Sequence, residues 1–371
     1  MHNNILEGER LDLKNKLSKK PFFSIVIPTY NRASDLQFAL YCIFQQSFSD
    51  YEIVISDNCS TDNTESIINK LKNKKIRYFR NGKNIGMITN QKKAIEYAKG
   101  EYVFLHGDDD FLLYEDSLQK IYEEIIKHYP GYIRVNYASL SADRKHIFSY
   151  KVNKPFEKNY YLPANAKNED ILSFIVDSDN YFFSGIIFRN DLPKSVTMVN
   201  ADPSPWINIL FYIAKKYGAY FITKHHVVAR WSRRTTKSED HGFYQPVEGK
   251  LKAENYFEIV KQKISKEAYQ RFLQKELITI YVNLFPAIKV SVGNKKMLQI
   301  SKRMHALDQT IIKNITYWIH FIPTLIIPRS ILVIIKNVYL YLYIRFSKVD
   351  NDRQIVSRLK ELEQDYAQAK T

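Results

Sequence analysis

The sequence predicts an α/β fold in which a mostly parallel central sheet is followed by a helical C-terminal region. Two observations support this fold class. Short apolar runs alternate with segments of helical periodicity over residues 21–130, and repeated strand–helix units build parallel sheets with helices on both faces. Beyond residue 250 the pattern is helical, and it includes the most apolar stretch of the chain.

Four strands are predicted in the first part of the chain, as apolar runs bounded by turn residues. They are Phe23–Ile27, Glu52–Ser56, Ile76–Phe79 and Tyr102–Leu105. Apolar residues at helical spacing predict the helices between and after them. These helices are expected at Leu36–Ile43, Asp62–Leu71, Ala94–Ala98 and Leu118–Ile125.

After residue 130 the alternation loosens, and shorter strands are expected around one helix, Trp206–Tyr217. The strands are Ile133–Tyr137, Tyr181–Phe188, Tyr220–Thr223 and Val227–Trp231. Helices follow as far as Leu284, and Ser265 is a predicted N-cap because its hydroxyl can accept from a free backbone N–H.

At 371 residues, the chain is long enough for one full domain and an appendage. The predicted divisions are an N-terminal extension at 1–20, an α/β domain at 21–240, a helical region at 241–348 and a solvated polar tail at 349–371. With 45% hydrophobic and 25% charged residues, disorder of the whole chain is excluded. Two cysteines cannot form a disulfide framework, which fits a reducing compartment, and residues 1–20 lack the apolar core of a secretory signal.

The net charge of +16 indicates an anionic partner or surface. Ten Lys and Arg residues lie between Lys289 and Lys348, against one acid, Asp308. Residues 311–346 of the same stretch are rich in Ile, Leu, Tyr and Trp, but no apolar run reaches the length of a membrane-spanning helix. A helix lying in the interface of an anionic membrane is therefore predicted, with a buried helical pair as the alternative. No nucleic-acid-binding module is recognisable, so nucleic acid is not an expected partner.

Three consecutive carboxylates, Asp108–Asp110, follow the fourth predicted strand. Like charges side by side repel, so such a cluster is costly unless a cation neutralises it. Mn²⁺ or Mg²⁺ binds a few carboxylates and leaves positions open for phosphate oxygens. In open α/β sheets, ligands bind beyond the carboxyl ends of the strands. This placement favours a metal site over a solvated acidic loop.

Other polar residues follow the predicted strands, and each allows two interpretations. Asp57 could contact a base or a ribose, or it could close a turn with Asn58. Arg32, Arg80 and Lys83 could bind phosphate, or they could be surface charges.

Asp202 precedes the helix predicted to begin at Trp206. It could be a general base that takes a proton from a hydroxyl. It could equally cap that helix, with Pro203 in the first turn, and sequence alone favours the cap. The basic residues of 230–237 could close over a diphosphate or lie at the surface. The histidines at 225–226 are predicted to be structural, because neighbours in a strand point to opposite faces.

With these residues in place, the chain resembles the family 2 glycosyltransferases of the GT-A fold, and within them the abequosyltransferase-like enzymes of O-antigen and capsule assembly. The resemblance covers roughly residues 21–235 and is specific through residue 130. It rests on the segments 24–32, 55–62, 84–86 and 100–110.

The resemblance implies a nucleotide-sugar site and a divalent metal. The predicted donor-binding residues are Pro28, Thr29, Tyr30, Arg32, Asp57, Lys83, Asn84, Gly86, Asp108 and Asp109. Asp108 and Asp110 are the predicted ligands of Mn²⁺ or Mg²⁺, and Asp202 is the candidate catalytic base. In the family pattern, Asp-x-Asp-Asp, Gly107 takes the first position. Val227 stands where processive synthases have Gln, so a single-addition enzyme is expected.

The predicted function is inverting transfer of a sugar from a nucleoside diphosphate sugar to a saccharide acceptor, most simply a lipid-linked one. The enzyme would serve bacterial surface polysaccharide synthesis from the cytoplasmic side, peripherally bound to the inner face of the plasma membrane. Two alternatives are a sugar nucleotidyltransferase and a non-catalytic, membrane-associated nucleotide-sugar-binding protein. The first would favour a Gly-rich phosphate loop after the first strand, and residues 28–31 contain no Gly.

Overall fold

The computed structural model describes most of the chain, in several segments. These are residues 20–140, 147–149, 156–201, 203–230, 251, 253–335, 338 and 352–369. They divide into two compact units. The first comprises Met1–Met198, Asn208–Arg230 and Arg353–Thr371, and the second comprises Val199–Ile207 and Trp231–Asp352.

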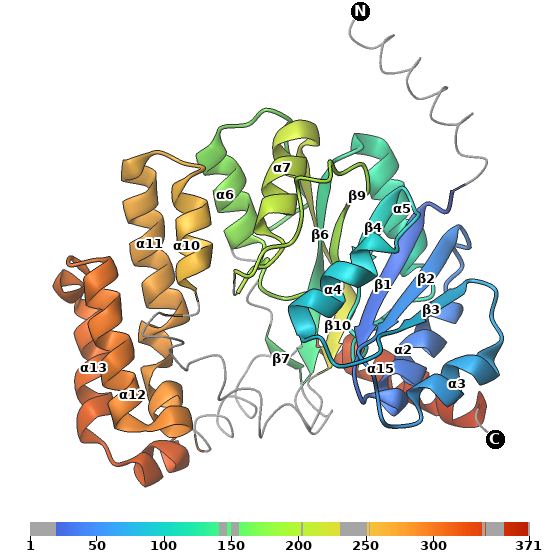
Figure 1. The fold of residues 1–371 in the computed structure, drawn as a ribbon. Coiled ribbons are helices and arrows are strands. Elements are labelled where there is room, and N and C mark those ends of the chain that lie inside the picture. The colour runs from blue at the N-terminus through green and yellow to red at the C-terminus, as the bar shows by residue number, and fades with distance from the viewer. Residues whose placement is uncertain are drawn as a thin grey trace, which may run out of the picture. The chain divides into compact units, whose positions relative to one another are not determined.

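The first unit is built on one sheet with the strand order β3-β2-β1-β4-β9-β6-β10-β5, to which β7 and β8 add beside β6 and β10 (Figure 1). The strands are β1 (Phe23–Thr29), β2 (Tyr51–Asp57), β3 (Ile76–Arg80), β4 (Tyr102–Leu105), β5 (Phe111–Leu112), β6 (Tyr132–Leu140), β7 (Ile147–Ser149), β8 (Tyr160–Leu162), β9 (Ile186–Arg189) and β10 (Ala219–Arg230). The four strands predicted before residue 130 are therefore confirmed as β1 to β4.

The sheet is mixed, so the prediction of a mostly parallel sheet was wrong. Strands β3, β2, β1 and β4 pair in parallel, as expected from their helical crossovers. Strand β9, however, enters antiparallel between β4 and β6, and β5 and β8 pair antiparallel with β10. An apolar run predicts a buried strand but carries no information on its direction. The two strands predicted at 220–231 are one strand, β10, whose register shifts between Ile222 and Val227.

Helices cover both faces of the parallel part of the sheet (Figure 1). Those of the first unit are α2 (Ala33–Phe44), α3 (Thr64–Leu71), α4 (Met87–Glu96), α5 (Ser117–His128), α6 (Asn168–Asp177) and, across the unit boundary, α7 (Ile207–Tyr217). Leu40 of α2 and Ile121 of α5 share one buried cluster with Ile25 and Phe104 of the strands. On the opposite face, Asn90 of α4 bonds to Ser56 of β2 through its side chain, at 2.8 Å.

The C-terminal tail is the helix α15 (Asp352–Ala369). The prediction that this tail is solvated was wrong, because one side of the helix is buried. Ile355, Leu359 and Leu362 are buried in a cluster with Phe38 of α2 and Phe111 of β5. The tail is polar on average, but these apolar residues recur every three or four positions. That spacing places the three side chains in one apolar stripe along the helix. The stripe indicates a buried face, which the polar average composition of the tail does not reveal.

The described part of the second unit is largely helical, with residues 329–335 also helical beyond the elements named next. Those elements are α10 (Glu254–Lys261), α11 (Lys266–Ile280), the short η2 (Val282–Leu284), α12 (Phe285–Leu307), the short η3 (Ile311–Lys313) and α13 (Ile315–Ile326). Ser265 caps α11 by accepting from the Ala268 N–H, which confirms that prediction. Gly293 interrupts α12 with φ of +80°, a conformation that glycine adopts without strain. Among the described residues, Lys266–Leu307 is long and apolar enough to cross a membrane by length and composition. Core helices pass the same test, so this is weak evidence for a span.

Candidate active site

Polar side chains converge at the carboxyl ends of β1, β2 and β4. Thr29 ends β1 and is in register with Asp57, which ends β2. The Asp108–Asp110 cluster follows β4, which pairs with β1 on its other side. Because the three strands are parallel neighbours, their final residues share one edge of the sheet. The structure thus brings together residues that lie up to 81 positions apart in the chain.

Arg32 and Thr29 hold the first two carboxylates of this aspartate cluster. The Thr29 hydroxyl donates to Asp108 Oδ2 at 2.7 Å. The Arg32 guanidinium bridges Asp108 and Asp109, with Nη1 at 3.1 Å from Asp108 Oδ1 and 2.5 Å from Asp109 Oδ2. The single positive charge of Arg32 is therefore shared between two carboxylates.

Asp110 is held from a different side, by a residue that sequence reasoning missed. Ser184 lies just before β9, and its hydroxyl donates to Asp110 Oδ2 while it accepts from the Gly107 N–H at 2.7 Å. A Cβ at Gly107 would come 2.5 Å from Asp110 Oδ2. A side chain at position 107 would therefore require the carboxylate of Asp110 to move.

The aspartate cluster carries more negative charge than its surroundings compensate. Burial raises the pKa of all three carboxyl groups, that of Asp110 to about 7, and neighbouring aspartates raise the pKa values of Asp109 and Asp110 further. Arg32 opposes these shifts but does not cancel them. In the described part of the chain, no three His, Cys, Asp or Glu side chains converge as metal ligands. Two carboxylates completed by water and phosphate oxygens suit Mn²⁺ or Mg²⁺, so the donor set fits a hard cation.

The raised pKa of Asp110 makes the stability of the metal-free protein depend on pH. Its pKa is about 7 in the folded chain and 3.8 ordinarily, so the folded state retains a proton that the unfolded state has lost. The contribution of Asp110 to the free energy of unfolding should therefore fall as pH rises from about 4 to 7. The free energy of unfolding of Asp110→Asn, minus that of wild type, should increase by about 1–3 kcal/mol from pH 5 to pH 8. Urea unfolding with a chelator present measures it. A difference that is the same at both pH values would contradict this.

Asp57 is fully buried, and the structure contains the turn that was its alternative interpretation. Its Oδ1 accepts from the Ser60 N–H at 2.8 Å and from the Ser60 hydroxyl at 2.6 Å. Its Oδ2 accepts from the Tyr78 hydroxyl at 2.5 Å. Arg80 pairs with Asp57 at 3.8 Å and with Glu65 at 3.5 Å, so this cation is engaged beside the turn.

The loop 81–86 lies against the end of β2 through Asn58. The side-chain amide of Asn58 donates to Asn84 Oδ1 at 2.8 Å, and its oxygen accepts from the Ile85 N–H at 2.9 Å. Gly86 has φ of +83° at the start of α4. Lys83 and Tyr30 are exposed at this edge, and Pro28 is half-buried in β1.

Some predicted groups lie elsewhere. Asp202 falls outside the described residues, as does the basic loop predicted at 230–237 except for Arg230, the last residue of β10. His226 is buried and bonds to Ser117 at 3.3 Å, and His225 lies 3.2 Å from Asn136. Burial lowers the pKa of both histidines to about 4, which keeps them neutral.

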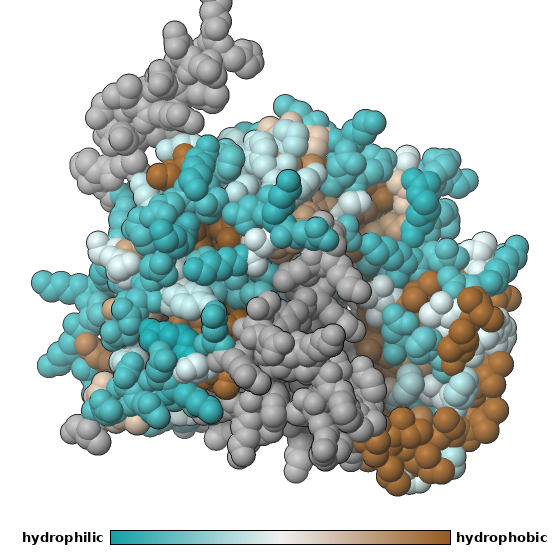
Figure 2. All heavy atoms as spheres, turned by 180° about the vertical axis from the view of Figure 1, so that it is seen from behind, coloured by the Kyte–Doolittle hydropathy of each residue, from teal (hydrophilic) through white to brown (hydrophobic). Residues whose placement is uncertain are grey.

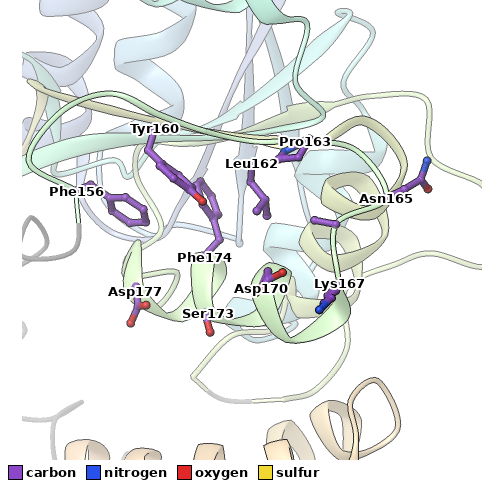
Figure 3. A pocket seen from close by; sticks show the side chains of 11 residues that line it. Phe156, Tyr160, Leu162, Pro163, Asn165, Lys167, Asp170, Ser173, Phe174 and Asp177 are labelled. Atoms are coloured by element: carbon purple, nitrogen blue, oxygen red, sulfur yellow. The ribbon is translucent and has the colours of Figure 1, made fainter.

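A separate cavity of about 750 Å³ lies between β8 and α6 (Figure 3). The rings of Phe156, Tyr160 and Phe174 line it, together with Asp170 and Asp177 of α6. Polar side chains of Asn165, Lys167 and Ser173 also line it, so the walls are mixed rather than apolar. The chain continues from α6 directly through 178–184 to Ser184, which contacts the aspartate cluster.

Comparison with known proteins identifies the domain that carries this site. Residues 24–187 match the model of glycosyl transferase family 2. A relative from Campylobacter jejuni, GalNAc(5)-diNAcBac-PP-undecaprenol beta-1,3-glucosyltransferase, is 25% identical over 290 residues, 74% of this chain and 90% of the relative. The protein is a glycosyltransferase with a family 2 domain. This result favours the predicted glycosyltransferase over the two alternatives, a sugar nucleotidyltransferase and a non-catalytic nucleotide-sugar-binding protein.

Further matches support the glycosyltransferase assignment over shorter segments. Abequosyltransferase RfbV from Salmonella typhimurium is 43% identical over 100 residues, which are 26% of this chain and 30% of that enzyme. The crystal structure of S. aureus TarS 1–349 covers 94% of this chain and 91% of its own, with a TM-score of 0.56 and 16% identity. At that identity the likeness shows the fold alone, and it confirms a GT-A-like α/β fold for this glycosyltransferase.

Proposed function

We propose that this glycosyltransferase is inverting and transfers a sugar from a nucleoside diphosphate sugar to a lipid-linked saccharide in bacterial surface polysaccharide synthesis. The observation that carries the proposal is the convergence of Thr29, Arg32 and the aspartate cluster at the ends of parallel strands. The names of two relatives, the glucosyltransferases from C. jejuni and Escherichia coli, specify acceptors on undecaprenol. TarS was crystallised with UDP-GlcNAc and with UDP.

In the proposed donor site, each residue has a distinct task. Pro28, Thr29 and Tyr30 line the nucleotide side, and Asp57 supports the base side through the turn that it closes with Ser60. Lys83, Asn84 and Gly86 form the rim opposite. Arg32 places a positive charge where the diphosphate leaves, and preorganised charge of this kind stabilises a transition state.

Asp108 and Asp110 would hold Mn²⁺ or Mg²⁺, since their charge is only partly compensated by Arg32. A bound divalent ion would supply Lewis-acid stabilisation of the departing diphosphate. Asp109 is left to accept from the ribose of the donor. Asp202 is the proposed base that takes the proton of the acceptor hydroxyl as this attacks the anomeric carbon from the face opposite the diphosphate.

We place the enzyme at the cytoplasmic face of the plasma membrane because α13 leaves one apolar face uncovered. Tyr317 and Phe321 of α13 pack on Phe285, whereas Ile315, Ile319, Ile322 and Ile326 are 47–73% exposed. Those four isoleucines recur at helical spacing along α13. Figure 2 shows an apolar patch at the lower right of the molecule. An apolar helix face in a basic segment fits an anionic membrane interface, where a lipid-linked acceptor would be found.

The test is turnover by the full-length protein on a panel of nucleoside diphosphate sugars with Mn²⁺. We expect one donor to be consumed and its nucleoside diphosphate released, with activity lost on addition of a chelator and restored by excess Mn²⁺. A lipid-linked acceptor should receive the sugar with inverted anomeric configuration, as read by NMR of the product. No turnover of any donor, or retention of configuration, would overturn the corresponding part of the proposal.

A further inference from the structure

We propose that Arg134 is a positioning residue that fixes Asp110 through Ser184. The inference rests on the proposed function, because it gives a structural reason for the orientation of a proposed metal ligand. Arg134 lies on β6, in a strand that contributes no residue to the predicted donor site. No sequence pattern singled it out.

Arg134 is the largest fully buried side chain among the described residues. Its Nε donates to the Ser178 carbonyl at 3.0 Å, and its Nη1 donates to the Ser184 carbonyl at 2.7 Å. The guanidinium also lies 5.1 Å from the ring centre of Tyr137 and 5.6 Å from that of Phe182. One planar group thus ties together both ends of the segment 178–184.

That segment delivers Ser184 to the aspartate cluster. The Ser184 hydroxyl donates to Asp110 and accepts from the Gly107 N–H, while its carbonyl is held by Arg134. The next residue, Gly185, is bonded to strands on both sides, donating to Leu105 at 3.1 Å and accepting from Val135 at 2.8 Å. Its φ is +83°, and a Cβ there would come 2.9 Å from the Val135 carbonyl. The backbone of Ser184 therefore has little freedom while Arg134 is in place.

Packing alone does not explain an arginine at this position. Within the described residues Arg134 forms no ion pair, and its Nη2 is buried without a hydrogen-bond partner. Burying a guanidinium in this way costs several kcal/mol. An apolar side chain of similar length would fill the space without that cost. What such a side chain cannot supply is the fixed pair of hydrogen bonds to the carbonyls of 178 and 184.

The test is a double-mutant cycle on the full-length protein, with Arg134→Lys and Ser184→Ala made singly and together. Mn²⁺ alone is the titrant, followed by calorimetry. Each single variant should weaken Mn²⁺ binding by roughly 10- to 100-fold, the usual effect of removing a group that orients a metal ligand. If Arg134 acts through Ser184, Arg134→Lys should have almost no further effect when residue 184 is already alanine.

A second readout does not depend on the metal. Amide hydrogen exchange of the Gly107 N–H, which bonds to Ser184, should speed up in both single variants and no further in the double. The matched control is Arg189→Lys, another largely buried arginine, which pairs with Asp191. It should change neither readout.

The outcomes separate the two proposals. If wild type binds no Mn²⁺, the metal site fails, and the Gly107 exchange still decides whether Arg134 acts through Ser184. Additive effects in either readout, or no effect of Arg134→Lys, overturn the role of Arg134. Should thermal melting show that Arg134→Lys does not fold, Phe182→Leu replaces it in the cycle, because Phe182 packs on the same guanidinium.

Discussion

Asp110→Ala is expected to lower kcat/KM for sugar transfer by roughly 10²- to 10³-fold. The substitution removes the carboxylate that Ser184 and Gly107 position, and with it one of the two proposed ligands of the metal. Nucleoside diphosphate release in the presence of Mn²⁺ measures the loss. Because the carboxylate of Asp110 is desolvated in the fold, its removal should not unfold the protein, and thermal melting should show a melting temperature no lower than that of wild type.

The control for Asp110→Ala is the same substitution at an exposed aspartate of α15, Asp365→Ala, which should retain wild-type turnover. Saturating Mn²⁺ should not rescue Asp110→Ala, since the lost oxygen atoms are part of the site. Near-normal turnover of Asp110→Ala would show that the aspartate cluster does not carry the reaction.

A double substitution on α13, Ile319→Glu with Ile322→Glu, should release the protein from anionic vesicles. Burial of an isoleucine side chain is worth about 1.5–3 kcal/mol, so loss of two such contacts weakens partitioning by roughly 10²- to 10⁴-fold. The added carboxylates are also repelled by anionic headgroups. Co-sedimentation with vesicles of phosphatidylglycerol and phosphatidylcholine measures the effect.

The comparison variant for α13 is Tyr161→Glu, which adds a charge at an exposed aromatic residue of the first unit. It should bind vesicles as wild type does. If the α13 variant bound vesicles as strongly as wild type does, the proposal that α13 contacts the membrane would be wrong. Equal binding of wild type to phosphatidylcholine vesicles with and without phosphatidylglycerol would remove the anionic requirement.

Patterns of neighbouring residues correctly predicted the strands and the helix cap that depend on neighbouring residues. The first four strands are correct because each is a short apolar run closed by turn residues, and the polar residues beyond them lie together because parallel strands end at one edge. The Ser265 cap depends only on neighbours within four positions.

What the sequence did not reveal depends on contacts between distant residues. The direction of β9 follows from its pairing with β4 and β6, strands that lie far from it in the chain. Ser184 reaches Asp110 across 74 positions, and a lone serine before an apolar run carries no signal of that contact. The side-chain oxygens of Asp57 accept from Ser60 and Tyr78, and the pairing with Tyr78, 21 positions away, has no signal in the sequence.

The packing of α15 has a consequence for biosynthesis. This helix belongs to the first unit although the whole second unit precedes it in the chain. While translation is under way, Phe38 and Phe111 lack the partners that Ile355, Leu359 and Leu362 later provide. The unit that bears the aspartate cluster can therefore complete its packing only after the second unit, with its apolar helix α13, has been synthesised.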